Sequence, residues 1–166
     1  MALLTADQPR HLQLVRVWRI CRKPHALNPL AGLGGLATSG RWHSKGRPIL
    51  YTASSAALAA LETLVHVDPL LAPADLQLLT IEISADLPSE TLDLSLLPKG
   101  WAGVPTPAVI QAMGDAWLQS QRSAVWIVPS AVIPMERKLL LNPQHPDAHR
   151  LRLIHTDAFS FDPRLL

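Results

Sequence analysis

The sequence predicts a single α+β domain in which a mixed, largely antiparallel sheet carries flanking helices. The first observation is that segments with a strand pattern outnumber those with helical spacing. The second is that 166 residues, of which 48% are hydrophobic, suffice for one core without metals or disulfides. We expect residues 12–166 to form this domain and residues 1–11, which show no periodicity, to form a loose N-terminal arm. The strands are expected at 12–20, 48–52, 76–84, 124–128, 138–142 and 151–155.

Composition argues against several classes of protein. The formal charge is only +2, from 15 basic and 13 acidic residues, which is too small a surplus to indicate direct binding of nucleic acid. No apolar run approaches the roughly 18 residues that a membrane-spanning helix requires. Cys21 is the single cysteine, so an internal disulfide is ruled out, and no secretory leader pattern is visible. We therefore expect a cytoplasmic protein.

The first expected strand places a cation in register with apolar residues. Along 12–20, Arg19 falls on the same side as Val15 and Val17. An arginine there is either exposed at a frayed strand end or buried with an anionic partner. Segment 23–40, which follows, contains several glycines but neither GxGxxG nor GKS or GKT, so it is interpreted as a loop rather than a Rossmann or P-loop phosphate site.

Residues 40–62 bring an arginine, aromatic rings and a carboxylate to one strand-to-helix turn. After the strand at 48–52, Ser54 or Ser55 can cap the following helix. Glu62 then borders the helix face that we expect to be buried, which makes it either a rim carboxylate paired with a lysine or arginine, or a functional group. The apolar positions expected to form that buried face are Leu58, Leu61, Leu64 and Val65.

The second half of the chain adds strands and one more helix. In 76–84, alternation predicts that Leu79, Ile81 and Ile83 face the core while Thr80 and Glu82 face solvent. Residues 86–105 are interpreted as irregular. A helix is expected from 106 to 121, and its apolar stripe is interpreted as core. The members of that stripe are Val109, Ile110, Met113, Trp117 and Leu118.

Several familiar sites find little support. His145 and His149 are four residues apart, but Pro146 and Asp147 lie between them and no cysteine joins them, so no metal site is expected. Ser130 follows a buried strand, where a hydroxyl either contacts a ligand or belongs to a turn, and it lacks the GxSxG nucleophile motif. Cys21 has no motif around it and is interpreted as a small apolar residue rather than a nucleophile.

An ordered set of short motifs nevertheless resembles a known family. The order is Arg19, then GRW at 40–42, LYT at 50–52, Glu62, VPS at 128–130 and NP at 142–143. Together these motifs resemble the RES domain, which is named for arginine, glutamate and serine and acts as the toxin partner of an Xre-type antitoxin. The resemblance covers residues 15–155, which is nearly the whole chain.

The resemblance implies a fold related to ADP-ribosyltransferases and an enzyme that degrades NAD. That enzyme would break the nicotinamide–ribose bond by phosphorolysis or hydrolysis, with NAD as substrate, inorganic phosphate as a candidate co-substrate, and neither a separate cofactor nor a metal. An Xre-type antitoxin is the implied protein partner, and self-assembly into a homo-oligomer is left open. Carried over by position, the implied catalytic residues are Arg19, Arg41, Tyr51, Glu62 and Ser130, and all of these except Glu62 are also implied to bind NAD.

The residue types agree with that implied chemistry. An arginine presents a planar, permanently charged fork to a pyrophosphate, and a tyrosine ring offers a face to nicotinamide. A carboxylate can stabilise the positive charge that develops on ribose as nicotinamide departs. Three alternatives stay open from the sequence: an ADP-ribosyltransferase acting on a protein, a ribonuclease toxin, and a non-enzymatic nucleotide-binding module.

Overall fold

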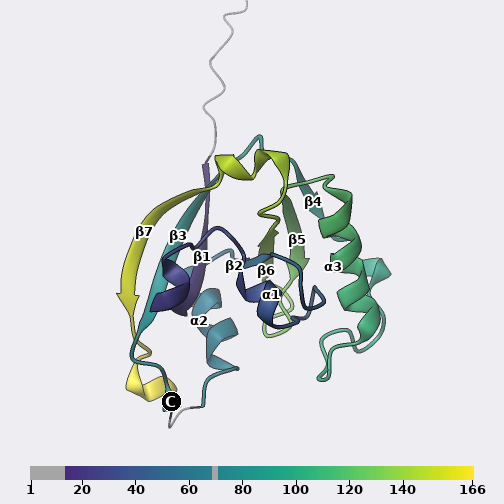
Figure 1. Ribbon diagram of the computed structural model, residues 1–166. Coiled ribbons are helices and arrows are strands. Elements are labelled where there is room, and N and C mark those ends of the chain that lie inside the picture. The colour runs from purple at the N-terminus through teal and green to yellow at the C-terminus, as the bar shows by residue number, and fades with distance from the viewer. Residues whose placement is uncertain (1–13, 69–70) are drawn as a thin grey trace, which may run out of the picture.

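The computed structural model describes residues 14–68 and 71–166, so the expected arm at 1–11 and the first residues of the expected strand 12–20 lie outside the described residues. The described chain forms one seven-stranded sheet with the strand order β4-β5-β6-β2-β1-β3-β7 (Figure 1). Neighbouring strands are antiparallel except β4 and β5, which are parallel. The predicted α+β class with a mixed, largely antiparallel sheet is confirmed.

Each predicted strand is present, and one strand was missed. The strands are β1 Leu14–Arg22, β2 Leu50–Ala53, β3 Leu76–Ser84, β4 Ser89–Thr91, β5 Val125–Pro129, β6 Arg137–Leu141 and β7 Arg152–Phe159. The helices are α1 Gly34–Ala37, α2 Ala56–Leu64 and α3 Ala108–Ser120. The interpretation of 86–105 as wholly irregular is wrong, because β4 pairs there with β5 through three residues that carry no apolar alternation.

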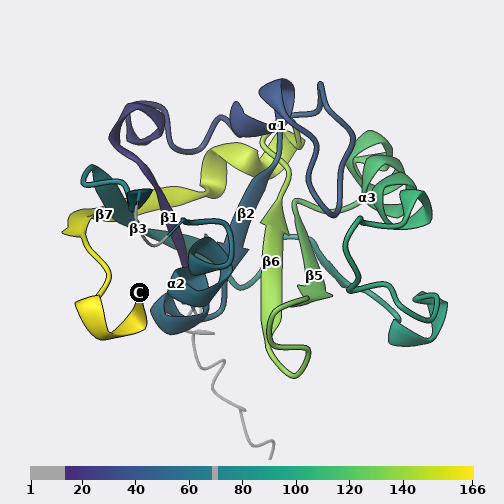
Figure 2. The ribbon, with the colours of Figure 1, turned by 90° about the horizontal axis from the view of Figure 1, so that it is seen from below.

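The two helices that the sequence predicts both pack on one face of the sheet. Leu58 and Ala59 of α2 cover Ala53 of β2, whereas Ile110 and Trp117 of α3 pack with apolar residues of β5 and β6. The views in Figures 1 and 2 agree that α2 lies beside β1 and β2 and that α3 lies beyond β5. The stretch of sheet between the two helices is therefore flanked on both sides.

The other face of the sheet builds the second part of the core without a long helix. Val17, Leu50, Ile81 and Leu141 are buried there, and Leu30 packs against them from the loop that follows β1. Val17 and Ile81 are opposed in the β1–β3 pairing, and opposed residues of antiparallel strands share a face. The sheet is thus covered on both sides over its centre.

The buried face of α2 differs from the one that the apolar spacing predicted. Leu58 is 2% exposed, but Leu61 is 37% and Val65 is 57% exposed. The face that contacts the sheet runs through Leu58 and Ala59, and Glu62 lies one helical turn beyond Leu58 on that same side. The expectation that Leu61 and Val65 belong to the core is wrong, and Glu62 takes a more inward position than a rim residue would.

Two smaller expectations about burial are also wrong. Thr80 of β3 is buried at 8% exposure rather than facing solvent; it opposes Trp18 of β1 and His155 of β7, whose side chains share its face of the sheet. Val109 is 51% exposed at the start of α3, because the neighbouring Ile110, at 0% exposure, occupies the side of the helix that packs on the core. Ile110, Trp117 and Leu118 are buried as predicted.

A split in the sheet separates β1 from β2. Trp18 opposite Ala53 is their only aligned pair among the described residues, although β1 continues to Arg22. In the loop that joins the two strands, Gly32 approaches Ile49 so closely that an added Cβ would lie 2.6 Å from the Ile49 nitrogen. Within the described part of the chain, no helix is both long and apolar enough to cross a membrane.

Candidate active site

Glu62 is the centre of the candidate site, and both of its carboxylate oxygens are held by the protein. The hydroxyl of Ser130 donates to Oε1 at 2.7 Å, and the ammonium of Lys138 donates to Oε2 at 2.8 Å. The side chains of Glu62 and Lys138 are only 14% and 13% exposed. A carboxylate withdrawn from water to this extent requires such donors, since an unpaired buried charge is very costly.

Ser130 belongs to the turn after β5 and also to the site. It is fully buried, its oxygen accepts hydrogen bonds from the backbone nitrogens of Val132 and Ile133 at 3.1 and 2.9 Å, and its hydrogen is directed to Glu62. A hydroxyl has one hydrogen and two lone pairs, so these three bonds occupy its hydrogen-bonding capacity. The interpretation of Ser130 as a turn residue is therefore confirmed, and a contact with a ligand stays a prediction.

Tyr51 presents its ring beside the carboxylate while its hydroxyl is held from behind. The Lys138 ammonium lies 5.0 Å from the centre of the Tyr51 ring. In the pairing of β2 with β6, Tyr51 opposes Leu140 and Ala53 opposes Lys138, so the tyrosine and the lysine share the face of the sheet on which α2 and α3 pack. Burial raises the pKa of Tyr51 well above its ordinary value, which keeps the phenol neutral.

His43 fixes the Tyr51 hydroxyl. Its Nε2 lies 3.0 Å from the carbonyl oxygen of Thr38, which can only accept, so Nε2 carries the hydrogen. Its Nδ1, 2.7 Å from the Tyr51 oxygen, then accepts the phenolic hydrogen. The backbone nitrogen of Trp42 donates to the same oxygen at 3.0 Å. Burial lowers the pKa of His43, which favours this neutral form.

Gly40 allows the close approach of these groups. A Cβ at this position would lie 2.7 Å from the Tyr51 hydroxyl and 2.7 Å from Cε1 of His43, which is too close for any other residue without a shift of these side chains. The glycine of the GRW motif thus has a packing reason, and the loop at 40–43 is shaped around the tyrosine.

Arg41 anchors a second loop over the site. Its Nη1 donates to the carbonyl oxygens of Trp101 and Gly103, at 2.8 and 3.1 Å, and the rings of Trp42 and Trp101 lie 5.9 Å apart. The charge of Arg41 also acts on Tyr51 and Lys138, because it contributes to the pKa shifts of both. The guanidinium is therefore close to the Glu62 cluster while it holds the segment around Trp101.

Arg19 stands apart from the other four predicted residues. Trp18 and Ile20 pack toward α2, so Arg19 leaves β1 on the opposite side, together with the buried Val17 and Cys21. It lines a cavity of about 220 Å³ together with residues of the segment 24–34, which belongs to the loop after β1. Its charge nevertheless lowers the pKa of Lys138, so its field reaches the cluster.

The structure thus brings Tyr51, Glu62 and Ser130 into one constellation, with Arg41 beside it and Arg19 at a neighbouring cavity. Two residues of this constellation, Lys138 and His43, were not predicted. Lys138 gave no clear sequence signal, because it follows Glu136 and Arg137 and precedes the apolar residues of β6, as a solvated lysine at a strand start would. His43 gave no sequence signal, since its role depends on contacts with Thr38 and Tyr51 that only the fold establishes.

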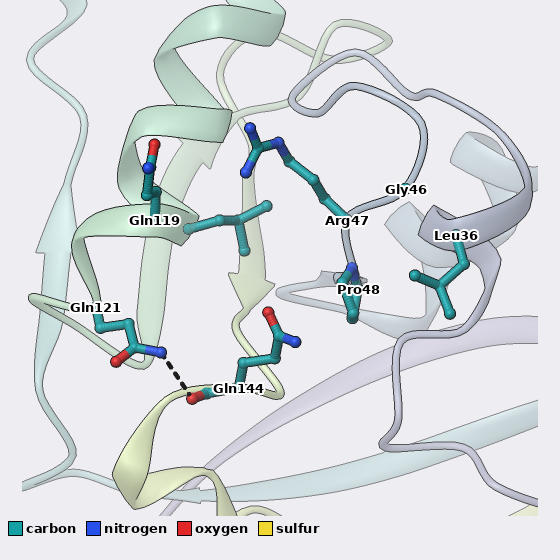
Figure 3. Close-up of a pocket in the computed structure, with 8 residues that line it drawn as sticks. Leu36, Gly46, Arg47, Pro48, Gln119, Gln121 and Gln144 are labelled. Carbon is teal, nitrogen blue, oxygen red and sulfur yellow. Dashed lines mark hydrogen bonds between the residues drawn. The ribbon is translucent and has the colours of Figure 1, made fainter.

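A larger cavity of about 380 Å³ lies elsewhere, between the loop at 46–48 and the end of α3 (Figure 3). It is lined by Arg47 and by Gln119, Gln121 and Gln144, and the amide of Gln121 donates to the carbonyl oxygen of Gln144 at 3.1 Å. The charge of Arg47 is already paired with Asp115 at 3.0 Å. Among the described residues no group of three or more His, Cys, Asp or Glu side chains could hold a metal ion.

Comparisons with known proteins identify the family of this chain. The RES domain family model matches residues 16–162. A protein of Sphingobium sp. (strain YBL2) named Prs ADP-ribosylating toxin is 38% identical over 153 residues, which cover 90% of this chain and 95% of that protein. A protein of Yersinia enterocolitica named Toxin Res is 37% identical over 155 residues, with 90% and 98% covered.

A solved structure supports the fold. The crystal structure of the M. tuberculosis MbcT–MbcA toxin–antitoxin complex contains a chain that matches with a TM-score of 0.68, over 92% of this chain and 87% of that one, at 20% sequence identity. At that identity the likeness concerns the fold. The family model spans nearly the whole chain, and the relatives exceed one third identity over almost their full length, so this chain belongs to the RES domain family.

Proposed function

We propose that this protein is a toxin enzyme that cleaves the bond between nicotinamide and ribose in NAD. The observation that carries the proposal is the Glu62 carboxylate, which is withdrawn from water, fixed by Ser130 and Lys138 and placed beside the ring of Tyr51. Membership of a family whose curated relatives are named toxins supports the biological part of the proposal.

In the proposed reaction the bond between the ribose C1 and the nicotinamide nitrogen breaks, and its electron pair leaves with nicotinamide. Positive charge then develops on the ribose, as in glycoside cleavage, and the negative charge of Glu62 stabilises it. A water molecule or a phosphate adds to C1 and loses a proton, which yields ADP-ribose or its 1-phosphate. Nicotinamide departs as a neutral molecule, so the reaction needs no strong general acid.

The other residues would orient the pyrophosphate and the nicotinamide of NAD. Arg19 and Arg41 supply charge for the pyrophosphate, and Arg41 does so while tied to the carbonyl oxygens of Trp101 and Gly103. Tyr51 offers its ring to nicotinamide, because its hydroxyl is occupied by His43 and Trp42. Ser130 acts through Glu62, since its three hydrogen bonds are all made within the protein.

A second candidate uses the same site with a different acceptor. The relative from Sphingobium is named an ADP-ribosylating toxin, which favours transfer of ADP-ribose to a protein side chain in place of water or phosphate. Both candidates share the cleavage of the nicotinamide–ribose bond, so release of nicotinamide tests the shared step and the fate of ADP-ribose separates the two.

We further propose that an antitoxin of the Xre type neutralises the enzyme. The support is the fold likeness to a chain of a toxin–antitoxin complex, together with the toxin names of the relatives. Expression in bacteria with and without a small helix-turn-helix protein from the neighbouring reading frame tests this. Growth arrest that the second protein relieves is expected, and arrest that persists when the two proteins are shown not to bind would contradict the pairing.

The activity is tested by incubating the purified protein with NAD, with and without phosphate, and with a cell extract. Chromatography is expected to show nicotinamide and either ADP-ribose or ADP-ribose 1-phosphate, whereas mass spectrometry of the extract detects ADP-ribose on a protein if transfer is the reaction. NAD that stays intact in all three mixtures would refute both candidates, and cleaved RNA with intact NAD would instead support the ribonuclease alternative.

A further inference from the structure

Lys138 is the least expected member of the Glu62 cluster. Its side chain is only 13% exposed, its ammonium donates to Oε2 of Glu62 at 2.8 Å, and it lies 5.0 Å from the centre of the Tyr51 ring. It therefore touches two of the residues that the proposed reaction requires. No role for Lys138 follows from the motifs that place this chain in its family.

The position of Lys138 is set by the sheet itself. In the pairing of β5 with β6 it opposes Val128, and in the pairing of β6 with β2 it opposes Ala53. Two flanking strands thus direct its side chain to the face that carries Tyr51, one residue pair away. The pairing on both sides thus fixes the face of the sheet from which the lysine side chain projects.

The protonated form of Lys138 is destabilised by its surroundings, and Glu62 is the charged group that stabilises it. Burial lowers the pKa of Lys138, the negative charge of Glu62 opposes that shift, and the charges of Arg19 and Arg41 add to it. An apolar residue of similar volume would fill the same space without this cost. Packing alone therefore does not account for a lysine here, whereas its hydrogen bond to Glu62 does.

The hydrogen bonds around Glu62 control the orientation of its carboxylate. A glutamate at the end of a helix has three rotatable side-chain bonds, and one hydrogen bond at Oε1 leaves the carboxylate free to rotate about the bond that carries it. Ser130 at Oε1 and Lys138 at Oε2 together fix the plane of the carboxylate. Reacting groups must be held within a fraction of an ångström for efficient catalysis.

We propose that Lys138 is a positioning residue that, with Ser130, fixes the Glu62 carboxylate beside the Tyr51 ring in the orientation that the ribose of NAD requires. This inference rests on the proposed cleavage of NAD and deepens it. Lys138 acts through Glu62 and is not itself assigned a contact with the substrate.

The test compares Lys138→Met, which keeps the length of the side chain without a donor, with Lys138→Gln, which restores an N–H near Oε2. We expect Lys138→Met to lower kcat for nicotinamide release by about 10- to 100-fold with KM for NAD changed much less, because orientation and not affinity is lost. Lys138→Gln is expected to recover part of kcat. Lys99→Met, which removes an exposed lysine, is the charge-matched control and should behave as the native protein.

The pH profile distinguishes positioning from a purely structural role. Glu62 and Tyr51 lie against Lys138, and the charges of Arg19 and Arg41 act on it electrostatically. Burial lowers the pKa of Lys138 below the ordinary lysine value of 10.5. The native kcat should therefore fall on the alkaline side before pH reaches 10.5, and Lys138→Met should lack that fall. Equal kcat values and equal pH profiles in the native and Lys138→Met proteins would overturn the inference.

A crystal structure of Lys138→Met keeps the test independent of the reaction. If the native protein leaves NAD intact, the proposed function fails, but the positioning of Glu62 can still be examined. We expect the carboxylate to rotate away from the orientation seen between Ser130 and Lys138. A Glu62 side chain unchanged against Ser130 in that variant would overturn the positioning role, and melting curves of all variants confirm that each is folded.

Discussion

Among single residues, the main feature of the site is that the Glu62 carboxylate lies within the electrostatic field of several cations. Lys138 contacts it directly, and the charges of Arg19 and Arg41 both act on Lys138. Such a cluster attracts a ligand that carries negative charge, and a dinucleotide with its pyrophosphate does so. The carboxylate remains available to a positive centre that develops only during the reaction.

The His43–Tyr51 pair gives a pH-dependent prediction at the same scale. The pKa of His43 in the folded protein lies below its ordinary value of 6.5 because of burial, so the unfolded chain binds the proton more tightly. The stability from neutral His43 is therefore fully present above about pH 6.5 and is lost as pH falls through the depressed folded pKa. Protonation would also remove the acceptor of the Tyr51 hydroxyl.

Melting temperatures of the native protein and of His43→Asn, measured from about pH 8 to about pH 5, check this prediction. The native protein should be the more stable at the upper end, and the difference should shrink toward the lower end because the variant has no imidazole to protonate. His66→Asn, at an exposed histidine, is the control and should follow the native curve. A difference between native and His43→Asn that is constant across this range would contradict the assignment.

At the scale of elements, α2 shows where sequence periodicity reaches its limit. Spacing alone predicted a stripe through Leu58, Leu61 and Val65, but the helix has only nine residues and contacts the sheet through Leu58 and Ala59. Several apolar stripes fit so short and leucine-rich a helix, and the sheet decides between them. The same decision carries Glu62 inward to meet Ser130 and Lys138.

The corrected face of α2 predicts opposite outcomes for two leucines. Leu58→Ala should lower the free energy of unfolding by roughly 2 to 5 kcal/mol, because it removes a buried side chain from the cluster with Ala53 and Ala59. Leu61→Ala, at 37% exposure, should cost less than about 1 kcal/mol. Urea unfolding measures both, and equal losses would show that the apolar spacing had identified the face correctly.

The contact of α3 with the loop at 40–43 depends on Gly114. A Cβ at this position would lie 1.7 Å from the carbonyl oxygen of Trp42, which is backbone and has no room to move without displacing the loop beside Arg41. Alanine usually stabilises a helix interior by about 1 kcal/mol relative to glycine. Here we expect Gly114→Ala to destabilise the protein instead, by about 1 to 3 kcal/mol, through overpacking.

Ala112→Gly is the matched control in the same helix, because residue 112 is exposed and only helix propensity changes there. Thermal unfolding should show a loss of about 1 kcal/mol for this control. Gly114→Ala should additionally lose nicotinamide release, since the displaced loop carries Arg41 and His43. A Gly114→Ala protein as stable as the native one would contradict the prediction, because it would show that the loop at 40–43 moves away from α3 at little energetic cost.

At the scale of the whole molecule, the α+β fold class and most of the strands could be predicted from the sequence. The way in which the strands pair with one another could not. Leu79, Ile81 and Ile83 follow a clear alternation, so β3 was predicted with its buried face. β4 has only three residues and none is apolar, so its pairing with β5 reflects tertiary contact alone. The split between β1 and β2 likewise has no signature in either strand.

The same distinction applies to the site. The motifs located Tyr51, Glu62 and Ser130, which the fold then joins, because each residue is tied to a recognisable strand end or helix. The role of Arg41 as an anchor for Trp101 and Gly103 depends on a loop 60 residues away, and no local pattern encodes it. Lys138 required the register of β6 against β2, which alternation along one strand does not supply.

In the proposed reaction a fixed Glu62 carboxylate drives the breaking of the nicotinamide–ribose bond, and Glu62→Gln tests this most directly because the amide keeps the shape and removes the charge. Nicotinamide release from NAD should be measured for the native and variant proteins, with melting curves to show that both are folded. We expect the folded variant to be slower by about 100-fold or more. A folded Glu62→Gln protein that releases nicotinamide at the native rate would contradict the claim.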